Sequence, residues 1–435
     1  MFALRRPITR LSVMAYSTKI KPAQRVSNFG RDVLLLQKLF RTRVKKRWTK
    51  LNPINIGECH EGRGIKKIQA VFSHAVSFSH PKGLLRLRNA LSTSYKKEFN
   101  GRELDPETNI VITAGANEGI FAVMAGFLDK GDEVIVMEPF FDQYIPNITM
   151  NGGVPVHVPL RPPADADHRA VSSHEWTLDI SELESKITHK TKMLVLNTPH
   201  NPIGKVFTDD ELNAIGQVAE KHDLLILSDE VYDRLYYPPF ERIPRIGNKF
   251  WDRTITVGSG GKSFAATGWR VGWLIGPDEL IQHAYAAQLR IIFCVNSPCQ
   301  EAVAAGVETS LVEPVFEQQI EDYIEKRRIL SKAFDELCLP YTVPEGAYYI
   351  LANTSKIQIP KNYPFPDILN DRGDDFKMCY WLAKEIGVCA IPPSEFYSKE
   401  HWPLASKYAR FAFCKTNDVL EQAVDRLRKL KDYIQ

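Results

Sequence analysis

The 435-residue sequence predicts an α/β fold, in which a large, doubly wound and mostly parallel sheet is combined with a smaller α+β domain. Short apolar runs alternate with amphipathic stretches between residues 84 and 275, and this alternation is typical of βαβ units. After Gly276 helical patterns dominate, and strand-like runs return near Tyr348 and Arg410. The hydrophobic content of 44% and the charged content of 25% are those of an ordinary globular protein.

Taken in order, the elements follow from apolar periodicity and turn signals. An amphipathic pattern beginning at Leu87 predicts a helix, and Gly115 separates the first strand from the next helix. A capping box, Thr208 with Glu211, opens a helix that ends near residue 221. Strands are expected at 109–113, 133–137, 154–158, 192–196, 224–227, 254–257, 269–275 and 348–351, helices at 118–128 and 420–433, and a surface loop at 161–174.

We expect four parts along the chain. Residues 83–310 form the large domain and residues 311–435 the smaller one, while residues 1–22 are a targeting segment and residues 23–82 fit poorly with the pattern of the two domains. The net charge of +4 is too small to indicate binding to nucleic acid or a membrane surface, and no apolar run reaches the roughly 18 residues of a membrane span. Seven cysteines contain no CxxC pair, so no metal site is predicted.

The first 31 residues are basic and contain no acidic residue before Asp32. Hydroxyl and apolar residues lie between the arginines and lysines, which is the composition of a mitochondrial transit peptide. The alternative is a disordered basic tail on a cytosolic protein. The sequence therefore predicts a mitochondrial protein, with a cytoplasmic location as the alternative.

A single lysine, Lys262, stands among small and hydroxyl residues directly after an apolar strand. A lysine in such a pocket can lose its proton and attack a carbonyl carbon. Ser259 and Arg270 offer a hydroxyl and a guanidinium that suit a phosphate. An aldehyde that also carries a phosphate describes pyridoxal phosphate. The alternative interpretation is a solvated lysine in a glycine turn.

Three further groups are candidates by position. Gly115, Ala116 and Asn117 lie between a strand and a helix N-terminus, where backbone N–H groups attract an anion. Asp229 follows a buried strand, although an aspartate there is often a helix cap. Arg410 lies between apolar residues and needs an anionic partner, which a structural salt bridge could also supply.

Residues 259–272, SGGKSFAATGWRVG, resemble the active-site lysine segment of fold-type I pyridoxal phosphate-dependent aminotransferases. Three further stretches of the chain also resemble motifs of that family. They read TAGANEG at residues 113–119, NTPHNPIG at residues 197–204 and SDEVY at residues 228–232. The resemblance extends from Gly83 onwards. Strings such as EPFFDQYIP and AIPPSEFY are most similar to the kynurenine aminotransferase group, also called glutamine transaminase K or cysteine-S-conjugate β-lyase, and to its fungal members.

The resemblance implies a role for each candidate. Lys262 forms a Schiff base with the cofactor and then acts as the base, Asp229 faces the pyridine nitrogen, and Arg410 clamps the substrate carboxylate. Phe141 stacks on the ring, and Asn201 and Tyr232 bond its phenolic oxygen. The implied cofactor-binding set is Gly115, Ala116, Asn117, Phe141, Asn201, Asp229, Tyr232, Ser259, Lys262 and Arg270, and the implied substrate-binding set is Gly57, Asn201 and Arg410, with no metal.

The family pattern weakens upstream of Gly83. Gly57 matches a glycine turn of the family, but Cys59 replaces its second glycine, and Phe78 replaces a tyrosine that would reach the partner subunit's cofactor phosphate. One hypothesis is that residues 34–81 are an out-of-frame or mis-spliced stretch, which the other reading frames of the coding DNA would test.

The resemblance thus implies a homodimeric enzyme that transaminates an amino acid, most simply L-kynurenine to kynurenic acid, with a 2-oxo acid acceptor and ping-pong kinetics. β-Elimination of cysteine conjugates and a broad aromatic or glutamine transaminase are alternatives at the same site. A different class of function is a protein that keeps this fold with weak catalysis because of the altered residues 23–82.

Overall fold

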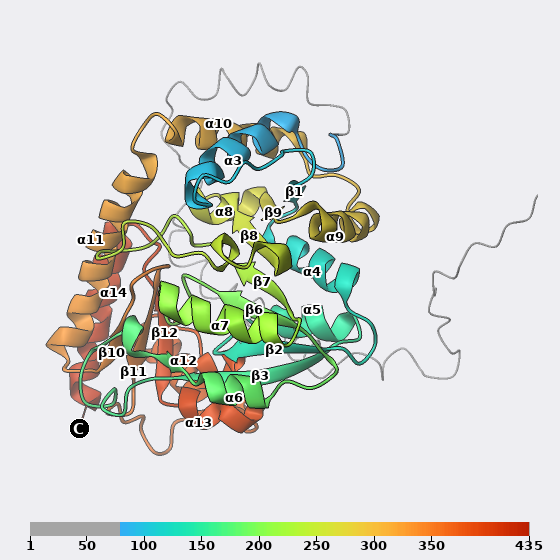
Figure 1. Cartoon of the computed structure of the whole chain (residues 1–435). Helices are drawn as coiled ribbons and strands as arrows, with labels where there is room; N and C mark the ends of the chain where they lie inside the picture. The colour runs from blue at the N-terminus through green and yellow to red at the C-terminus, as the bar shows by residue number, and fades with distance from the viewer. Residues whose placement is uncertain (1–78, 435) are drawn as a thin grey trace, which may run out of the picture. The chain divides into compact units, whose positions relative to one another are not determined.

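The structure is a computed structural model that describes residues 79–434, all of which belong to one compact unit (Figure 1). Residues 1–22, where a targeting segment is expected, lie outside the described residues, as do Gly57, Cys59, Phe78 and most of the segment 23–82. Within the described part, no helix is both long enough and apolar enough to cross a membrane.

The larger sheet has eight strands in the order β1-β9-β8-β7-β6-β2-β3-β5. The five strands from β8 to β3 run parallel, whereas β1, β9 and β5 pair antiparallel with their neighbours, so the predicted mostly parallel sheet is confirmed. Its strands are β1 (Ile110–Thr113), β2 (Glu133–Glu138), β3 (Val154–Arg161), β5 (Thr177–Leu178), β6 (Thr191–Asn197), β7 (Leu225–Asp229), β8 (Thr254–Ser259) and β9 (Gly272–Ile275).

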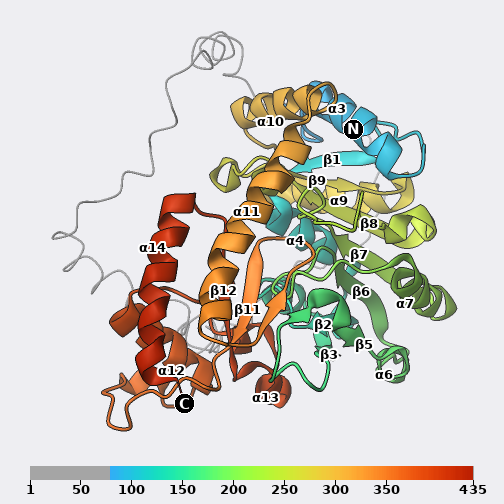
Figure 2. The same ribbon diagram turned by 90° about the vertical axis from the view of Figure 1, so that its left-hand side faces the viewer.

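Alternating side chains of the parallel strands enter two different cores, which is why the sheet is covered by helices on both faces. In β2, Val134 and Val136 pack with α4 (Ala116–Phe127), α5 (Tyr144–Met150) and α9 (Asp278–Ile291). Ile135 and Met137 of the same strand pack with α6 (Ile180–Ser185) and α7 (Asp209–Lys221) (Figure 2). The doubly wound arrangement follows directly from this apolar pattern.

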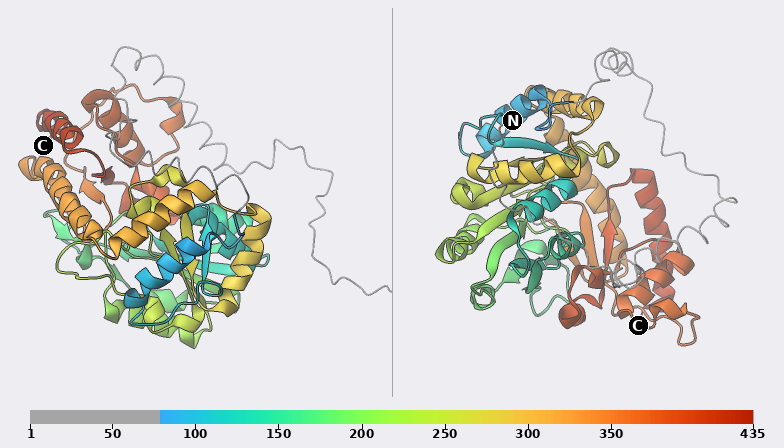
Figure 3. Two further views of the ribbon diagram at one scale, coloured as in Figure 1. Left: turned by 90° about the horizontal axis from the view of Figure 1, so that it is seen from above. Right: turned by 90° about the vertical axis from the view of Figure 1, so that its right-hand side faces the viewer.

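A third core lies at the β1–β9 end of the sheet. The helices α3 (Leu85–Glu98) and α10 (Ser297–Ser310) lie side by side there and pack on Ile110, Ile112 and Trp273 (Figures 2 and 3). Ser79 joins this region, because its hydroxyl donates to the Val295 carbonyl over 2.8 Å.

The smaller sheet has the order β12-β11-β10-β4 and packs with two long helices. Its strands are β4 (Val171–Ser172), β10 (Tyr341–Val343), β11 (Tyr349–Asn353) and β12 (Tyr408–Ala412). The helices α11 (Val315–Glu336) and α14 (Asn417–Leu427) lie side by side, and α12 (Asp374–Trp381) and α13 (Trp402–Ala405) complete this part (Figure 1). One continuous apolar core joins both sheets, from Val111 to Leu430.

Most predicted elements are present, and two predictions are wrong in part. The strand expected at 269–275 begins only at Gly272, because Thr267–Trp269 forms a 3₁₀ turn and Arg270 adopts φ 52°. The loop expected at 161–174 contains β4, whose Val171 is buried and whose Ser172 caps a 3₁₀ turn with Glu175. The capping box of Thr208 and Glu211 is confirmed.

Candidate active site

The carboxyl ends of three adjacent parallel strands meet at one cavity of about 350 Å³. Asn197 ends β6, Asp229 ends β7 and Ser259 ends β8, and Asn197 and Asp229 are direct register partners. Residues from the smaller sheet close the cavity from the other side. Its lining residues are Ala116, Asn117, Ile120, Phe141, Asp142, Asn197, Asn201, Asp229, Val231, Tyr232, Ser259, Lys262, Arg270, Tyr349, Ile391, Glu395, Phe396 and Arg410.

Lys262 lies in α8 (Gly260–Ser263), the single helical turn that directly follows β8. Its Nζ donates to Tyr348 Oη over 2.8 Å, and it lies 5.4 Å from the centre of the Tyr232 ring. Burial lowers the pKa of the Lys262 ammonium below its usual value; Cys414 and Asp229 oppose this shift, and the charges of Arg410 and Arg270 add to it. The lysine is therefore more nucleophilic at neutral pH than a surface lysine.

Asp229 is almost completely buried at the base of the cavity, with 3% of its surface exposed. Tyr144 donates its hydroxyl to Asp229 Oδ2, and the Val231 N–H donates to Oδ1 over 3.3 Å. Burial raises the pKa of the Asp229 carboxyl to about 6, although both hydrogen bonds and the nearby Lys262 oppose that rise. A cationic group placed beside this carboxylate would meet a strong partner.

The N-terminus of α4 and Arg270 form an anion-binding end of the cavity. Gly115 precedes α4 with φ 84°, and no described side chain caps the helix. The first N–H groups of a helix lack partners within the helix, so here they are available to a ligand. A Cβ atom on Gly115 would lie 2.4 Å from Arg270 Nη2, so only glycine lets this guanidinium approach.

Arg410, on β12, lies on the opposite side of the cavity from the sheet of β7 and β8. Its Nη1 donates to Asn201 Oδ1 over 2.9 Å, and its guanidinium lies 4.4 Å from the centre of the Tyr349 ring and 4.7 Å from that of Phe396. Among the described residues, its buried Nε has no hydrogen-bond partner. A partly buried guanidinium with a donor to spare is suited to a carboxylate.

The loop that carries Asn201 is fixed by Asn197. Asn197 Oδ1 accepts from the Asn201 N–H over 2.7 Å, and Asn197 Nδ2 donates to the Asp229 carbonyl over 2.9 Å. The peptide bonds before Pro199 and Pro202 are cis. This loop thereby links the end of β7 to Arg410.

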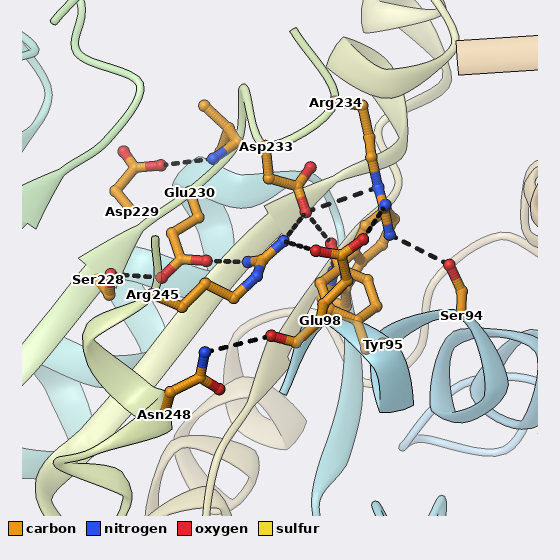
Figure 4. A network of polar contacts seen from close by, with 12 residues as sticks. Ser94, Tyr95, Glu98, Ser228, Asp229, Glu230, Asp233, Arg234, Arg245 and Asn248 are labelled. Atoms are coloured by element: carbon orange, nitrogen blue, oxygen red, sulfur yellow. Dashed lines mark hydrogen bonds and ion pairs between the residues drawn. The ribbon is translucent and has the colours of Figure 1, made fainter. Parts of the chain in front are cut away.

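A buried network of ion pairs involves Glu230 and Asp233, which directly follow Asp229 in the chain (Figure 4). Arg245 Nη2 donates to Asp233 Oδ2 over 2.8 Å, and Arg245 Nη1 donates to Glu230. Tyr95, on α3, donates to the same Asp233 oxygen over 2.6 Å. The network joins α3, the loop after β7 and the 3₁₀ turn at Ile246–Asn248, so it fixes the backbone on which Asp229 stands.

The structure brings the predicted site residues together. All of those that it describes line the cavity except Gly115, which contacts Arg270 instead. Among the residues that line or touch the site and that sequence reasoning did not assign are Tyr144, Asn197, Tyr348, Tyr349 and Phe396. Tyr144, Asn197 and Phe396 stand inside the strings EPFFDQYIP, NTPHNPIG and AIPPSEFY that carried the resemblance, so these motifs contained the signal without specifying which side chains point inward.

The arrangement can bind an anion at one end and a carboxylate at the other, with a nucleophilic amine between them. No cluster of His, Cys, Asp and Glu suited to a metal ion occurs among residues 79–434. The amine of Lys262, with its lowered pKa, supports covalent capture of a carbonyl and proton transfer by the same group.

Comparison with known proteins agrees with this geometry. Residues 64–427 match the family model described as "Aminotransferase class I and II". The chain is 49% identical over 359 residues to "Probable kynurenine--oxoglutarate transaminase BNA3" of Saccharomyces cerevisiae, covering 82% of this chain and 80% of that protein. It is 35% identical over 451 residues to "Kynurenine--oxoglutarate transaminase" of Dictyostelium discoideum, covering 98% and 100%. The crystal structure of Bna3p from S. cerevisiae is similar with a TM-score of 0.82 and 47% identity, covering 85% of this chain and 88% of that one.

Proposed function

Because this chain belongs to the class I and II aminotransferases, we propose that it transfers the amino group of L-kynurenine to a 2-oxo acid with pyridoxal 5'-phosphate as cofactor. One observation carries the proposal. A partly buried lysine with a lowered pKa, a buried aspartate and an arginine with a spare donor line the same cavity.

The residues fit the cofactor. Asp229 would hold the pyridine nitrogen, and the N-terminus of α4 with Ser259 and Arg270 would hold the phosphate. Phe141 and Tyr232 line the space between these two ends. When bound, the cofactor supplies a protonated ring that stabilises negative charge at the α-carbon of the amino acid.

The side chains of the protein then have distinct tasks. Arg410 binds the α-carboxylate and orients the amino acid, with Asn201 fixing one guanidinium nitrogen. Lys262 removes the proton from the substrate α-carbon, for which its lowered pKa is suited. The apolar and aromatic lining of Ile391, Phe396 and Tyr349 excludes water from the reacting atoms.

The choice of kynurenine rests on the relatives and on the cavity wall. Both relatives are named kynurenine–oxoglutarate transaminases. The wall beside Arg410 is aromatic, and an aromatic wall suits the aniline ring of kynurenine. We further propose a homodimer in the mitochondrion. The basic composition before Asp32, which contains no acidic residue, supports the mitochondrial location. The 44% exposure of the large apolar side chain of Trp269, which adjoins the cavity residue Arg270, supports the dimer.

The first test is chemical. We expect the protein loaded with pyridoxal phosphate, reduced with borohydride and digested, to carry a pyridoxyl label on the peptide of Lys262, and Lys262→Ala to carry none there. With L-kynurenine and 2-oxoglutarate, the wild-type protein should form kynurenic acid, while Lys262→Ala should be slower by several orders of magnitude. An unlabelled Lys262 peptide would contradict the cofactor assignment, and a labelled protein that forms no kynurenic acid would contradict the substrate. Pyruvate released from a cysteine conjugate reports β-elimination.

A further inference from the structure

We propose that Tyr348 is a positioning residue, whose phenol oxygen holds the Lys262 amine whenever that amine is not covalently engaged. The inference rests on the proposed function, since it concerns the lysine that the reaction uses. It comes from a contact that the sequence motifs do not reveal. Lys262 Nζ lies 2.8 Å from Tyr348 Oη, although 86 positions separate the two residues in the chain.

The Tyr348 side chain is held rigidly. Its ring lies edge-on to Tyr232 with centres 5.2 Å apart, is tilted against Tyr349 at 4.7 Å, and stacks on Tyr323 of α11 at 6.0 Å. Only 8% of Tyr348 is exposed. Three aromatic neighbours therefore fix the direction in which the hydroxyl points, and that direction is toward Lys262.

Tyr348 keeps its proton while Lys262 loses its own more readily than usual. Burial raises the pKa of the Tyr348 phenol far above its ordinary value, so the group stays neutral throughout the physiological range. A neutral phenol can accept an N–H from the amine and can also donate its own proton to the amine lone pair. It can therefore hold Lys262 in either protonation state.

Such an anchor matters because a lysine side chain is long and flexible. In the proposed reaction the Lys262 amine is free for part of every catalytic cycle and must then move a proton at the substrate α-carbon. An amine held at one point needs less reorganisation to reach that carbon than a freely moving one. The alternative is that Tyr348 only packs in an aromatic core. Its hydroxyl would then be dispensable for the reaction.

The chain offers a matched pair of variants. Tyr348→Phe removes the hydroxyl that contacts Lys262 and keeps the ring. Tyr323→Phe removes a hydroxyl from the ring that stacks on Tyr348, and no contact of that hydroxyl with Lys262 is found among the described residues. Circular dichroism and thermal melting establish that both variants fold. We expect both to bind pyridoxal phosphate.

The first readout uses the full-length chain without cofactor and requires no turnover. Trace acetylation with acetic anhydride, followed by peptide mass spectrometry, gives the labelling rate of Lys262 relative to the exposed Lys221. We expect this ratio to rise at least threefold in Tyr348→Phe, because the amine is no longer held, and to stay at the wild-type value in Tyr323→Phe.

The second readout is the single-turnover half-reaction with L-kynurenine. We expect Tyr348→Phe to be about tenfold slower, with a larger isotope effect from α-deuterated kynurenine and a KM within twofold of wild type, because Arg410 is untouched. Tyr323→Phe should match wild type. The proposal is overturned if Tyr348→Phe matches wild type in either readout, or if Tyr323→Phe changes as much as Tyr348→Phe. If the wild-type protein does not convert kynurenine, the proposed function fails, while the labelling ratio still decides whether Tyr348 holds the lysine.

Discussion

Three carboxyl groups at or near the cavity have pKa values raised by burial. The pKa of Asp229 is about 6, and those of Glu118 and Glu230 are about 7. In each case loss of contact with water is the largest cause, and hydrogen bonds or the charge of a nearby lysine or arginine offset only part of it. A bound cation beside Asp229 would reverse this situation, because it would favour the ionised carboxylate. A bound cation therefore keeps the Asp229 carboxylate ionised, and the ionised carboxylate in turn stabilises the charge of the cation.

A prediction at the residue scale concerns Asp229 in the cofactor-free protein. Its folded-state pKa of about 6 lies above the ordinary value of 3.8, so the unfolded chain releases this proton first as the pH rises. Stability is therefore lost between about pH 4 and pH 6, by about 2 to 3 kcal/mol from this residue. Asp229→Asn should lose that part of the pH dependence in urea denaturation, whereas Asp129→Asn, at an exposed position, should retain it. Identical pH profiles for Asp229→Asn and wild type would contradict the assignment.

Among the elements, the network around Arg245 fastens α3 to the loop that follows β7 (Figure 4). The Arg245 side chain is completely buried and forms ion pairs with both Glu230 and Asp233. Removing one partner of a buried pair leaves charges without compensation. The network is therefore expected to contribute to stability far more than ion pairs on the surface.

We predict that Arg245→Met lowers the free energy of unfolding by about 3 to 5 kcal/mol. The matched control is Arg86→Met, because Arg86 also bonds two carboxylates, Glu301 and Glu308, but is 46% exposed. That variant should lose about 1 kcal/mol or less. Urea denaturation of both variants checks the prediction, and equal losses would show that burial does not distinguish the two sites.

A second connection between elements involves Glu138, the last residue of β2, which is completely buried. It accepts hydrogen bonds from the Ser398 N–H and from His401, and His157 Nδ1 lies 3.4 Å from its Oε1. The Phe140 N–H also donates to the Phe396 carbonyl over 2.8 Å. The segment that carries Phe396 is thereby attached to the segment that carries Phe141.

For Glu138→Ala we predict a loss of about 2 to 4 kcal/mol, because buried donors are left without an acceptor. We also expect the KM for the amino donor to rise, since both cavity walls depend on this attachment. Glu133→Ala, at the start of the same strand, is the control and should leave KM unchanged. Calorimetric melting measures the loss of stability, and steady-state kinetics measure the change in KM. An unaltered KM for Glu138→Ala would show that binding of the amino donor does not depend on this attachment.

Local signals predicted the elements well, and long-range contacts account for what was missed. The strands expected at 224–227 and 254–257 are present, although each extends two residues further, to Asp229 and Ser259, and the cap at Thr208 follows from a pattern within a few residues. In contrast, β4 is a strand only because β10, some 170 positions away, pairs with it. The site followed the same rule. Motifs identified Lys262 and Arg410, but no local pattern indicates that Lys262 contacts Tyr348.

At the scale of the whole molecule, the location and assembly that we propose have a direct test. A fusion of residues 1–31 to a fluorescent protein should enter mitochondria, and replacing its arginines with glutamine should leave it in the cytosol. Sedimentation of the full chain loaded with cofactor should give twice the mass of 49.5 kDa. A cytosolic fusion or a monomer would contradict the corresponding proposal.

The pairing of β4 with β10 also limits where the chain can be divided into separately expressed parts. A protein expressed from residue 311 onwards would lack Val171 and Ser172, so one side of β10 would present unpaired N–H and C=O groups to any other strand. Such a fragment should self-associate instead of remaining dispersed. We expect a separate peptide that contains Val171 and Ser172 to restore the solubility of this fragment, because two distant stretches of the chain build the smaller sheet together.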